Sequence, residues 1–148
     1  HSAIDKGSKD EFSKFVKEDL NKEYLWQKYQ KIPLIVRFPN GEKRGVYSKT
    51  VGQIDILPTI ANLYGLTGTK YLGRNIFSEG DNIAVLRDGS FVCGNIYYNK
   101  TTNFACDINI GLPVNNYTLL KKKAESQLEA SDDIFRYNFY KTGKIENK

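Results

Sequence analysis

The hydrophobic pattern near the start of the chain is helical. From Ser8 onward, apolar residues recur at intervals of three and four, the spacing of an amphipathic helix. They are Phe12, Phe15, Val16 and Leu20. Ser8 is followed three residues later by Glu11, the capping-box pattern in which each side chain accepts a hydrogen bond from the other residue's backbone nitrogen. The sequence therefore predicts a helix from residue 8 to about residue 19.

A continuous apolar run follows Pro33 and closes at the turn sequence Pro39-Asn40-Gly41. A short run without alternation is typical of a strand buried on both faces, as in the parallel sheet of an α/β layer. We expect this strand at residues 34–38. The sequence shows no obvious neighbours for it, so the chain on its own would expose both faces and have poor independent stability.

The string QIDILPTIANLYG predicts a second helix. Asp55 is a natural N-cap, Pro58 falls in the first turn, and Gly65 stands where a left-handed C-cap is expected. An aspartate three residues before Pro-Thr is better explained as a helix cap than as a catalytic acid. One side of the helix is apolar, and we expect it to pack against the sheet. This side consists of Ile56, Leu57, Ile60, Leu63 and Tyr64.

After residue 80 the pattern changes to a period of two, which predicts three antiparallel strands. The pair Arg87-Asp88 reads as part of a turn rather than a site, and Asp88-Gly89 indicates a two-residue hairpin. A second turn is expected from Asn99 through Thr102. With that turn near residues 100 and 101, Cys93 and Cys106 lie almost opposite each other. They form either a cross-strand disulfide, in an oxidising compartment, or two small buried side chains.

The last third of the chain carries a helical stripe with an asparagine at its start, which predicts a long helix laid on the antiparallel sheet. The stripe consists of Tyr117, Leu120, Ala124, Leu128, Ser131 and Phe135. The predicted fold class is α/β: a buried strand with helices in residues 1–80, then a small antiparallel sheet packed by a long helix in residues 81–148.

Composition narrows the class of protein. No window approaches the roughly 18 consecutive apolar residues of a membrane span. The net charge is +5 with a pI of about 9.1, but the basic residues are scattered and no nucleic-acid-binding motif accompanies them, so we expect no nucleic acid partner. Methionine is absent from all 148 residues, and we expect the chain to be an internal or C-terminal piece of a larger protein.

Several motifs in one order resemble a known family. They are IPLIVRFP, VGQIDILPTIANLYGL, YLGRNIFS, VLRDGSFV and LEASDDIFRYNFYK. Together, from His1 to about Lys141, they are similar to the extracellular catalytic domain of the lipoteichoic acid synthase family, phosphoglycerol transferases of the sulfatase and alkaline phosphatase superfamily. The resemblance implies an alkaline-phosphatase-like fold of which this chain is the C-terminal portion.

The resemblance also implies site residues. His1 matches a histidine that, together with the aspartate before it in the family, ligates Mn²⁺ or Mg²⁺; the alternative is that His1 is only a terminal remnant. Asp5 stands where the family places a serine that contacts the substrate phosphate, and a carboxylate there would repel a phosphodiester. The threonine nucleophile of the family would lie before residue 1, so we expect this chain to be inactive alone.

The function implied is the transfer of glycerol phosphate from phosphatidylglycerol to a growing polyglycerolphosphate chain at the outer leaflet of the bacterial cell membrane. The partner implied is the N-terminal remainder of the same domain. Two alternatives stay open. One is another superfamily enzyme, a sulfatase or a phosphoethanolamine transferase; the other is a non-catalytic surface module.

Overall fold

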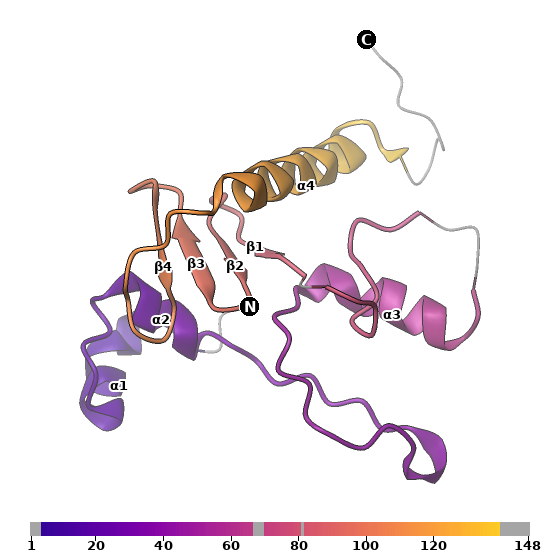
Figure 1. The fold of residues 1–148 in the computed structure, drawn as a ribbon, viewed down its shortest axis with the longest axis horizontal. Helices are drawn as coiled ribbons and strands as arrows, with labels where there is room; N and C mark the ends of the chain where they lie inside the picture. The colour runs from indigo at the N-terminus through magenta and orange to yellow at the C-terminus, as the bar shows by residue number, and fades with distance from the viewer. Residues whose placement is uncertain (1–3, 67–69, 81, 140–148) are drawn as a thin grey trace.

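The second half of the chain forms an antiparallel sheet crossed by one long helix (Figure 1). A computed structural model of the chain describes residues 4–66, 70–80 and 82–139. The strands are β1 (Ala84–Val85), β2 (Phe91–Cys93), β3 (Ile96–Asn99) and β4 (Phe104–Asp107), joined in the order β1-β2-β3-β4. The helix α4 (Thr118–Arg136) follows the sheet. Sheet and helices together confirm the α/β class.

Both predicted turns are present. Leu86 pairs with Ser90 through a backbone hydrogen bond of 2.8 Å, so the first hairpin loop has three residues rather than the predicted two. Gly89 occupies its left-handed position with φ of 87°, which is the usual arrangement for a loop of this length. In the second turn, Asn99 Oδ1 accepts a hydrogen bond from the Thr102 nitrogen at 3.1 Å.

The prediction of three strands is wrong by one, because the chain turns sharply at Gly94-Asn95 and makes β2 and β3 separate strands. Cys93 then pairs with Ile96 across β2 and β3, while Cys106 pairs with Tyr97 across β3 and β4. The two cysteines lie on opposite faces of the sheet with a strand between them, and no disulfide joins them. Of the two alternatives, the structure therefore has two small buried side chains and no disulfide.

The main core lies between the sheet and α4. Ala124 of α4 is 1% exposed and packs on Phe91 and Tyr98, whose rings stack 5.0 Å apart. Burying one large apolar side chain stabilises a fold by roughly 1.5–3 kcal/mol. The stripe of α4 is thus confirmed at its N-terminal end, but Phe135 at the other end is 83% exposed. The predicted asparagine cap is absent, since Tyr117 is the N-cap and makes no side-chain cap bond.

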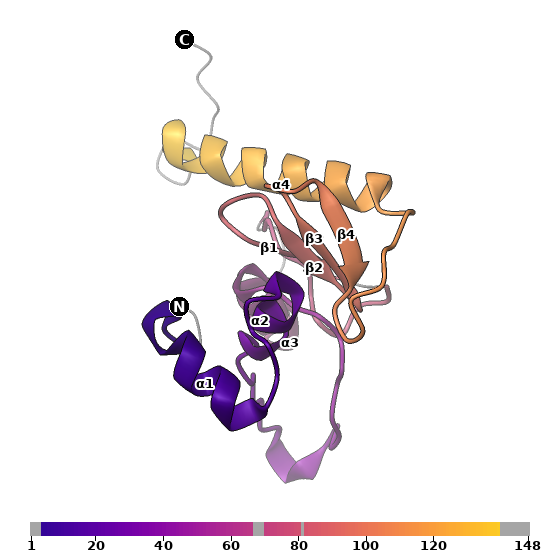
Figure 2. The same ribbon diagram turned by 90° about the vertical axis from the view of Figure 1, so that its left-hand side faces the viewer.

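The opposite face of the sheet is covered from the N-terminal side of the chain, by α2 (Glu23–Tyr29) (Figure 2). Tyr24 of this helix packs against the cluster formed by Tyr97, Cys106 and Ile108. A third cluster, of Leu20, Leu25 and Trp26, joins α2 to α1 (Lys9–Val16). The sheet is therefore the middle layer between α4 and α2.

The start of α1 differs from the prediction. Ser8 makes no side-chain cap bond; instead a 3₁₀ turn, η1 (Lys6–Ser8), precedes α1, and Asp5 caps that turn. The helix ends at Val16, three residues earlier than predicted, because Lys17 adopts the left-handed conformation with φ of 57°. A residue in that conformation ends the run of helical hydrogen bonds.

Residues 34–38 form no strand, so this element of the prediction is wrong for the described chain. Leu34 is 45% exposed and Ile35 is 87% exposed. A strand of a parallel sheet requires neighbouring strands on its edges, and the described residues supply none for this segment. It runs instead as one limb of a long loop that turns at η2 (Pro39–Gly41), where the predicted turn is confirmed.

The predicted second helix is present as η3 (Gln53–Asp55) followed by α3 (Ile56–Leu63). Its C-terminus is as predicted: Gly65 has a φ of 66°, and the Leu66 nitrogen donates to the Ala61 oxygen at 2.8 Å. The predicted packing of its apolar side on the sheet is wrong, because that side is exposed. The residues turned inward are Pro58, Thr59 and Ala61.

Candidate functional site

Asp55, just before α3, is the one acidic side chain that is buried among the described residues. Asp55 is 3% exposed, and its two oxygens accept from the backbone nitrogens of Gly52 and Arg74, each at 2.8 Å. Thr59, equally buried, donates from its hydroxyl to the Asp55 carbonyl at 2.6 Å and accepts from the Ile76 nitrogen at 3.0 Å. Each carboxylate oxygen of Asp55 thus accepts a hydrogen bond from a backbone N–H group.

This geometry refines the sequence interpretation of Asp55. Its role is structural, as expected, but the side chain does not cap α3. It reaches back to Gly52 and across to the loop at Arg74, and so fastens the start of the helix to a segment 19 residues further along. The D-x-x-P-T motif therefore serves as a joint between two pieces of chain.

Gly73 completes this joint. A Cβ at Gly73 would lie 2.1 Å from the carbonyl oxygen of Ile54, and backbone atoms cannot move aside as a flexible side chain can. Only glycine permits the loop to approach close enough for the Arg74 nitrogen to reach Asp55. This close approach accounts physically for the glycine in the motif YLGRNIFS.

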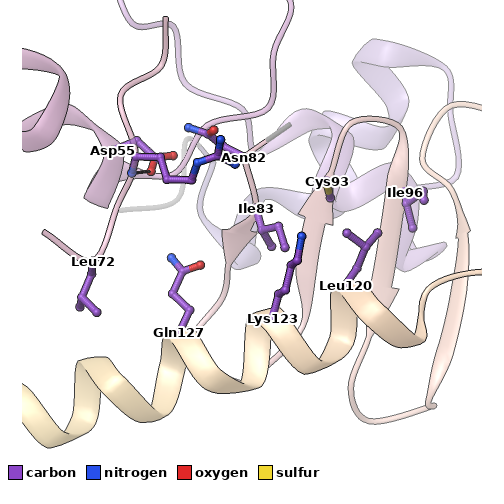
Figure 3. Close-up of a pocket in the computed structure, with 10 residues that line it drawn as sticks. Asp55, Leu72, Asn82, Ile83, Cys93, Ile96, Leu120, Lys123 and Gln127 are labelled. Carbon is purple, nitrogen blue, oxygen red and sulfur yellow. Dashed lines mark hydrogen bonds between the residues drawn. The ribbon is translucent and has the colours of Figure 1, made fainter. Parts of the chain in front are cut away.

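A cavity of about 380 Å³ opens beside the joint (Figure 3). Lys123 and Gln127 project toward it from α4, and Ile83, the residue just before β1, also lines it. On its inner side, Asn82 is 2% exposed, and neither polar atom of its side-chain amide has a hydrogen-bond partner. Within residues 4–66, 70–80 and 82–139, no group of three or more His, Cys, Asp or Glu side chains is placed to hold a metal ion.

The residues predicted to form the site are placed as follows. His1 lies outside the described residues. Asp5 is exposed, and its carboxylate accepts from the Gly7 nitrogen at 2.8 Å; it does not line the cavity. Arg87 forms an ion pair with Asp132 of α4, and Asp88 accepts from the Ser90 nitrogen at 2.8 Å. The interpretation of Arg87 and Asp88 as turn residues is therefore supported by their contacts.

Tyr97 and Cys106, on the face of the sheet that α2 covers, have raised pKa values. Burial, followed by the negative charge of Glu23, raises the pKa of Tyr97 to about 12. Burial and the neighbouring Asp107 raise the pKa of the Cys106 thiol. Both shifts favour the neutral form, so neither group is prepared to act as a nucleophile or base at neutral pH.

Sequence reasoning missed two features. The helix α2 lies in a polar and aromatic stretch, although Leu25, Trp26 and Tyr29 have helical spacing. The dipeptide Gly94-Asn95 between apolar runs is itself a known hairpin signal, and Gly94 has a positive φ of 55°. Both signals could have been found from the sequence.

The described residues thus form an α/β chain in which a buried aspartate joint sits beside an antiparallel sheet. No family model matches the chain. Several curated proteins do match the chain. Lipoteichoic acid synthase 1 of Bacillus subtilis (strain 168) is 31% identical over 150 aligned residues, which cover 95% of this chain and 23% of that protein. Lipoteichoic acid synthase of Staphylococcus aureus (strain USA300) is 32% identical over 136 aligned residues, which cover 83% of this chain and 19% of that protein.

The resemblance to the lipoteichoic acid synthase family is therefore confirmed, and the chain is homologous to a C-terminal part of these proteins. It spans about a fifth to a quarter of the length of the curated relatives it matches. Across the described ranges, none of the helices combines the length and the apolar character needed to cross a bilayer.

Proposed function

We propose that this chain is the C-terminal section of the catalytic domain of a metal-dependent phosphoglycerol transferase, which polymerises glycerol phosphate from phosphatidylglycerol into lipoteichoic acid. The observation that carries the proposal is the 31% identity to lipoteichoic acid synthase 1 over 95% of the chain. The glycine and aspartate of the joint support it, because the motifs that carry the resemblance are also the ones that the fold requires.

His1 would be the contribution of this chain to a divalent cation, Mn²⁺ or Mg²⁺. Such a cation neutralises charge on a phosphoryl group. The described residues offer no cluster of three ligands, so the remaining donors would come from the rest of the domain. The described donors of this chain therefore do not by themselves make a complete cation site.

Asp5 would lie near the substrate if His1 binds the cation, since only three residues separate them. Its exposed carboxylate carries a negative charge toward any phosphodiester that approaches. Two like charges at roughly 4 Å repel by about 1 kcal/mol in water and by more where water is excluded. Asp5 therefore disfavours a doubly charged donor more than a singly charged one such as phosphatidylglycerol.

The chain alone would not turn over substrate, because the proposed nucleophile, a threonine, belongs to the N-terminal remainder of the domain. The complete enzyme would work at the extracytoplasmic face of the bacterial membrane, where phosphatidylglycerol is available. The net charge of +5 is compatible with an anionic lipid surface.

The proposal is tested by a chimera in which residues 1–148 replace the matching segment of the B. subtilis synthase. The purified chimera in phosphatidylglycerol vesicles with Mn²⁺ is expected to release diacylglycerol and form polyglycerolphosphate, and a His1→Ala chimera is expected to do neither. Release of sulfate from an aryl sulfate, or transfer of phosphoethanolamine, without polyglycerolphosphate would refute the proposal in favour of another superfamily enzyme.

A further inference from the structure

The turn at η2 contains the only asparagine of the sequence that is followed by glycine, Asn40-Gly41. In such a pair the glycine nitrogen can attack the side-chain amide carbon of the asparagine, because glycine has no side chain to obstruct the approach and its backbone rotates freely. Every other asparagine of the chain precedes a larger residue. The sequence therefore singles out one place where this reaction is favoured.

The side chain of Asn40 is accessible and unrestrained. Asn40 is exposed, and its amide makes no hydrogen bond with any residue of the described ranges. The turn lies at the far end of the long loop that precedes α3, away from the sheet (Figure 1). Exposed loop ends of this kind are where backbone motion and covalent damage concentrate. The amide carbon of Asn40 is thus open to water and free to rotate.

The reaction requires a backbone rotation at Asn40. Its φ is 56° and its ψ is 12°, and with this ψ the Gly41 nitrogen points away from the Asn40 side chain. The left-handed conformation is unfavourable for a residue other than glycine, so leaving it costs little. The bond from the Glu42 nitrogen to the Pro39 oxygen measures 3.3 Å, longer than the usual range of about 2.7–3.2 Å. The turn therefore opposes the rotation only weakly.

A chemically similar pair, Asp88-Gly89, is restrained by the first hairpin. The Ser90 nitrogen donates to Asp88 Oδ1 at 2.8 Å, and the Ser90 hydroxyl donates to Asp88 Oδ2 at 3.1 Å. The Gly89 nitrogen donates to the Leu86 oxygen at 2.9 Å. Bringing the Gly89 nitrogen onto the side chain of residue 88 would break these bonds. The fold thus restrains one of the two pairs and leaves the side chain of Asn40 free.

We propose that Asn40 is a site of spontaneous deamidation in the folded protein. The Gly41 nitrogen gives up its proton and forms a bond to Asn40 Cγ. The bond from Cγ to Nδ2 breaks, and ammonia leaves with that proton, which closes a succinimide ring. Water then opens the ring at either carbonyl carbon and yields an aspartyl or an isoaspartyl residue. The reaction uses only the loop and water, so it does not depend on the proposed function.

The cations beside the turn stabilise the product. The guanidinium of Arg44 lies so close to Gly41 that it would overlap an added Cβ, and the Lys43 ammonium lies 5.1 Å from the centre of the Phe77 ring. Deamidation places a new negative charge beside these two positive charges. The isoaspartyl product also lengthens the backbone at residue 40 by one carbon, which displaces the segment that carries Lys43.

The test uses the full chain carrying Asp88→Asn, which has a matched Asn-Gly pair at the restrained hairpin. The folded chain is incubated in neutral buffer, and peptide mass and isoaspartate-specific methylation measure the reaction at positions 40 and 88. Residue 40 is expected to react at least about tenfold faster, because the hairpin must open locally before residue 88 can react. In concentrated urea the two positions should react at equal rates, since both pairs are then unrestrained.

Equal rates at the two positions in the folded chain would overturn the proposal, as would a residue 40 that stays intact while residue 88 reacts. A second variant tests the route. Gly41→Ala adds a methyl group beside the attacking nitrogen and is expected to slow the reaction at residue 40 strongly, while circular dichroism confirms that the chain is still folded. An undiminished rate in Gly41→Ala would contradict the succinimide and indicate direct hydrolysis of the amide instead.

Discussion

The carboxylate of Asp55 and the backbone nitrogen of Arg74 are joined by a hydrogen bond of 2.8 Å across 19 residues of sequence. The same carboxylate holds the Gly52 nitrogen, so one buried side chain fixes the entry to α3 and the loop that anchors it. The joint is the structural basis of the D-x-x-P-T motif in this chain.

Replacing Asp55 by alanine should destabilise the chain severely. The change leaves two backbone N–H groups without acceptors, and each unsatisfied buried group costs about 1–3 kcal/mol. Urea denaturation followed by circular dichroism measures the loss. The matched control is Asp10→Ala, at an exposed position on α1, which should change the free energy of unfolding by less than about 0.5 kcal/mol. Equal effects of the two substitutions would contradict the joint.

Gly73→Ala should destabilise the same joint by overpacking. Its Cβ would meet the Ile54 oxygen at 2.1 Å, and inserting an atom into filled space costs about 1–3 kcal/mol. Gly52→Ala is the control, because a Cβ there has only ordinary contacts, the nearest at 3.6 Å. Thermal melts should show a lower Tm for Gly73→Ala alone; a tolerated Gly73→Ala would show that the loop does not approach Ile54.

Cys93 and Cys106 should not form a disulfide with each other even after purification in air. They lie on opposite faces of the sheet with β3 between them, roughly 10 Å apart at a spacing of about 4.8 Å per strand, and a disulfide requires Cα atoms within about 7 Å. Peptide mapping without reductant is expected to yield both cysteines alkylated. A linked pair of peptides carrying Cys93 and Cys106 would refute the observed register.

Ionisation of Tyr97 should destabilise the folded chain at alkaline pH. The folded pKa of about 12 lies above the ordinary value of 10, so the neutral phenol stabilises the fold fully below about pH 10, and this contribution is lost as the pH rises toward 12. Absorbance at 295 nm is expected to show one tyrosine titrating late and together with unfolding. In Tyr97→Phe that late component should be missing; its persistence would assign the shift to another tyrosine.

Asp5→Ser should improve use of an anionic donor by the chimera. Serine retains an oxygen that can accept from the Gly7 nitrogen, but it removes the charge. The expected result is a lower KM for phosphatidylglycerol in vesicles, with kcat less affected. Asp10→Ser removes the same charge from the exposed face of α1 and serves as the control. An unchanged KM in Asp5→Ser would place Asp5 away from the donor.

The local elements could be predicted where one residue determines a backbone conformation. Gly65 ends α3 and Gly89 closes the first hairpin because each adopts a positive φ, of 66° and 87°, that glycine tolerates. The long helix α4 followed from its apolar stripe. The positions of the two cysteines could not be predicted correctly, because the unrecognised turn at Gly94-Asn95 divides the predicted second strand. As a result, β3 lies between Cys93 and Cys106.

The packing could not be predicted in the same way. Periodicity identifies which side of α3 is apolar but not what lies against it, and the structure leaves that side open. The roles of Asp55 and Gly73 depend on a contact between segments 19 residues apart, which no local pattern specifies. The proposed ligand His1 lies outside the described residues, so its role stays a prediction.

The outward apolar side of α3 has a consequence for handling the chain in solution. Leu57, Ile60 and Tyr64 are 58%, 45% and 79% exposed, and contiguous exposed apolar side chains promote self-association. Concentrated solutions of the isolated chain are therefore expected to form soluble oligomers, which a mild nonionic detergent should disperse.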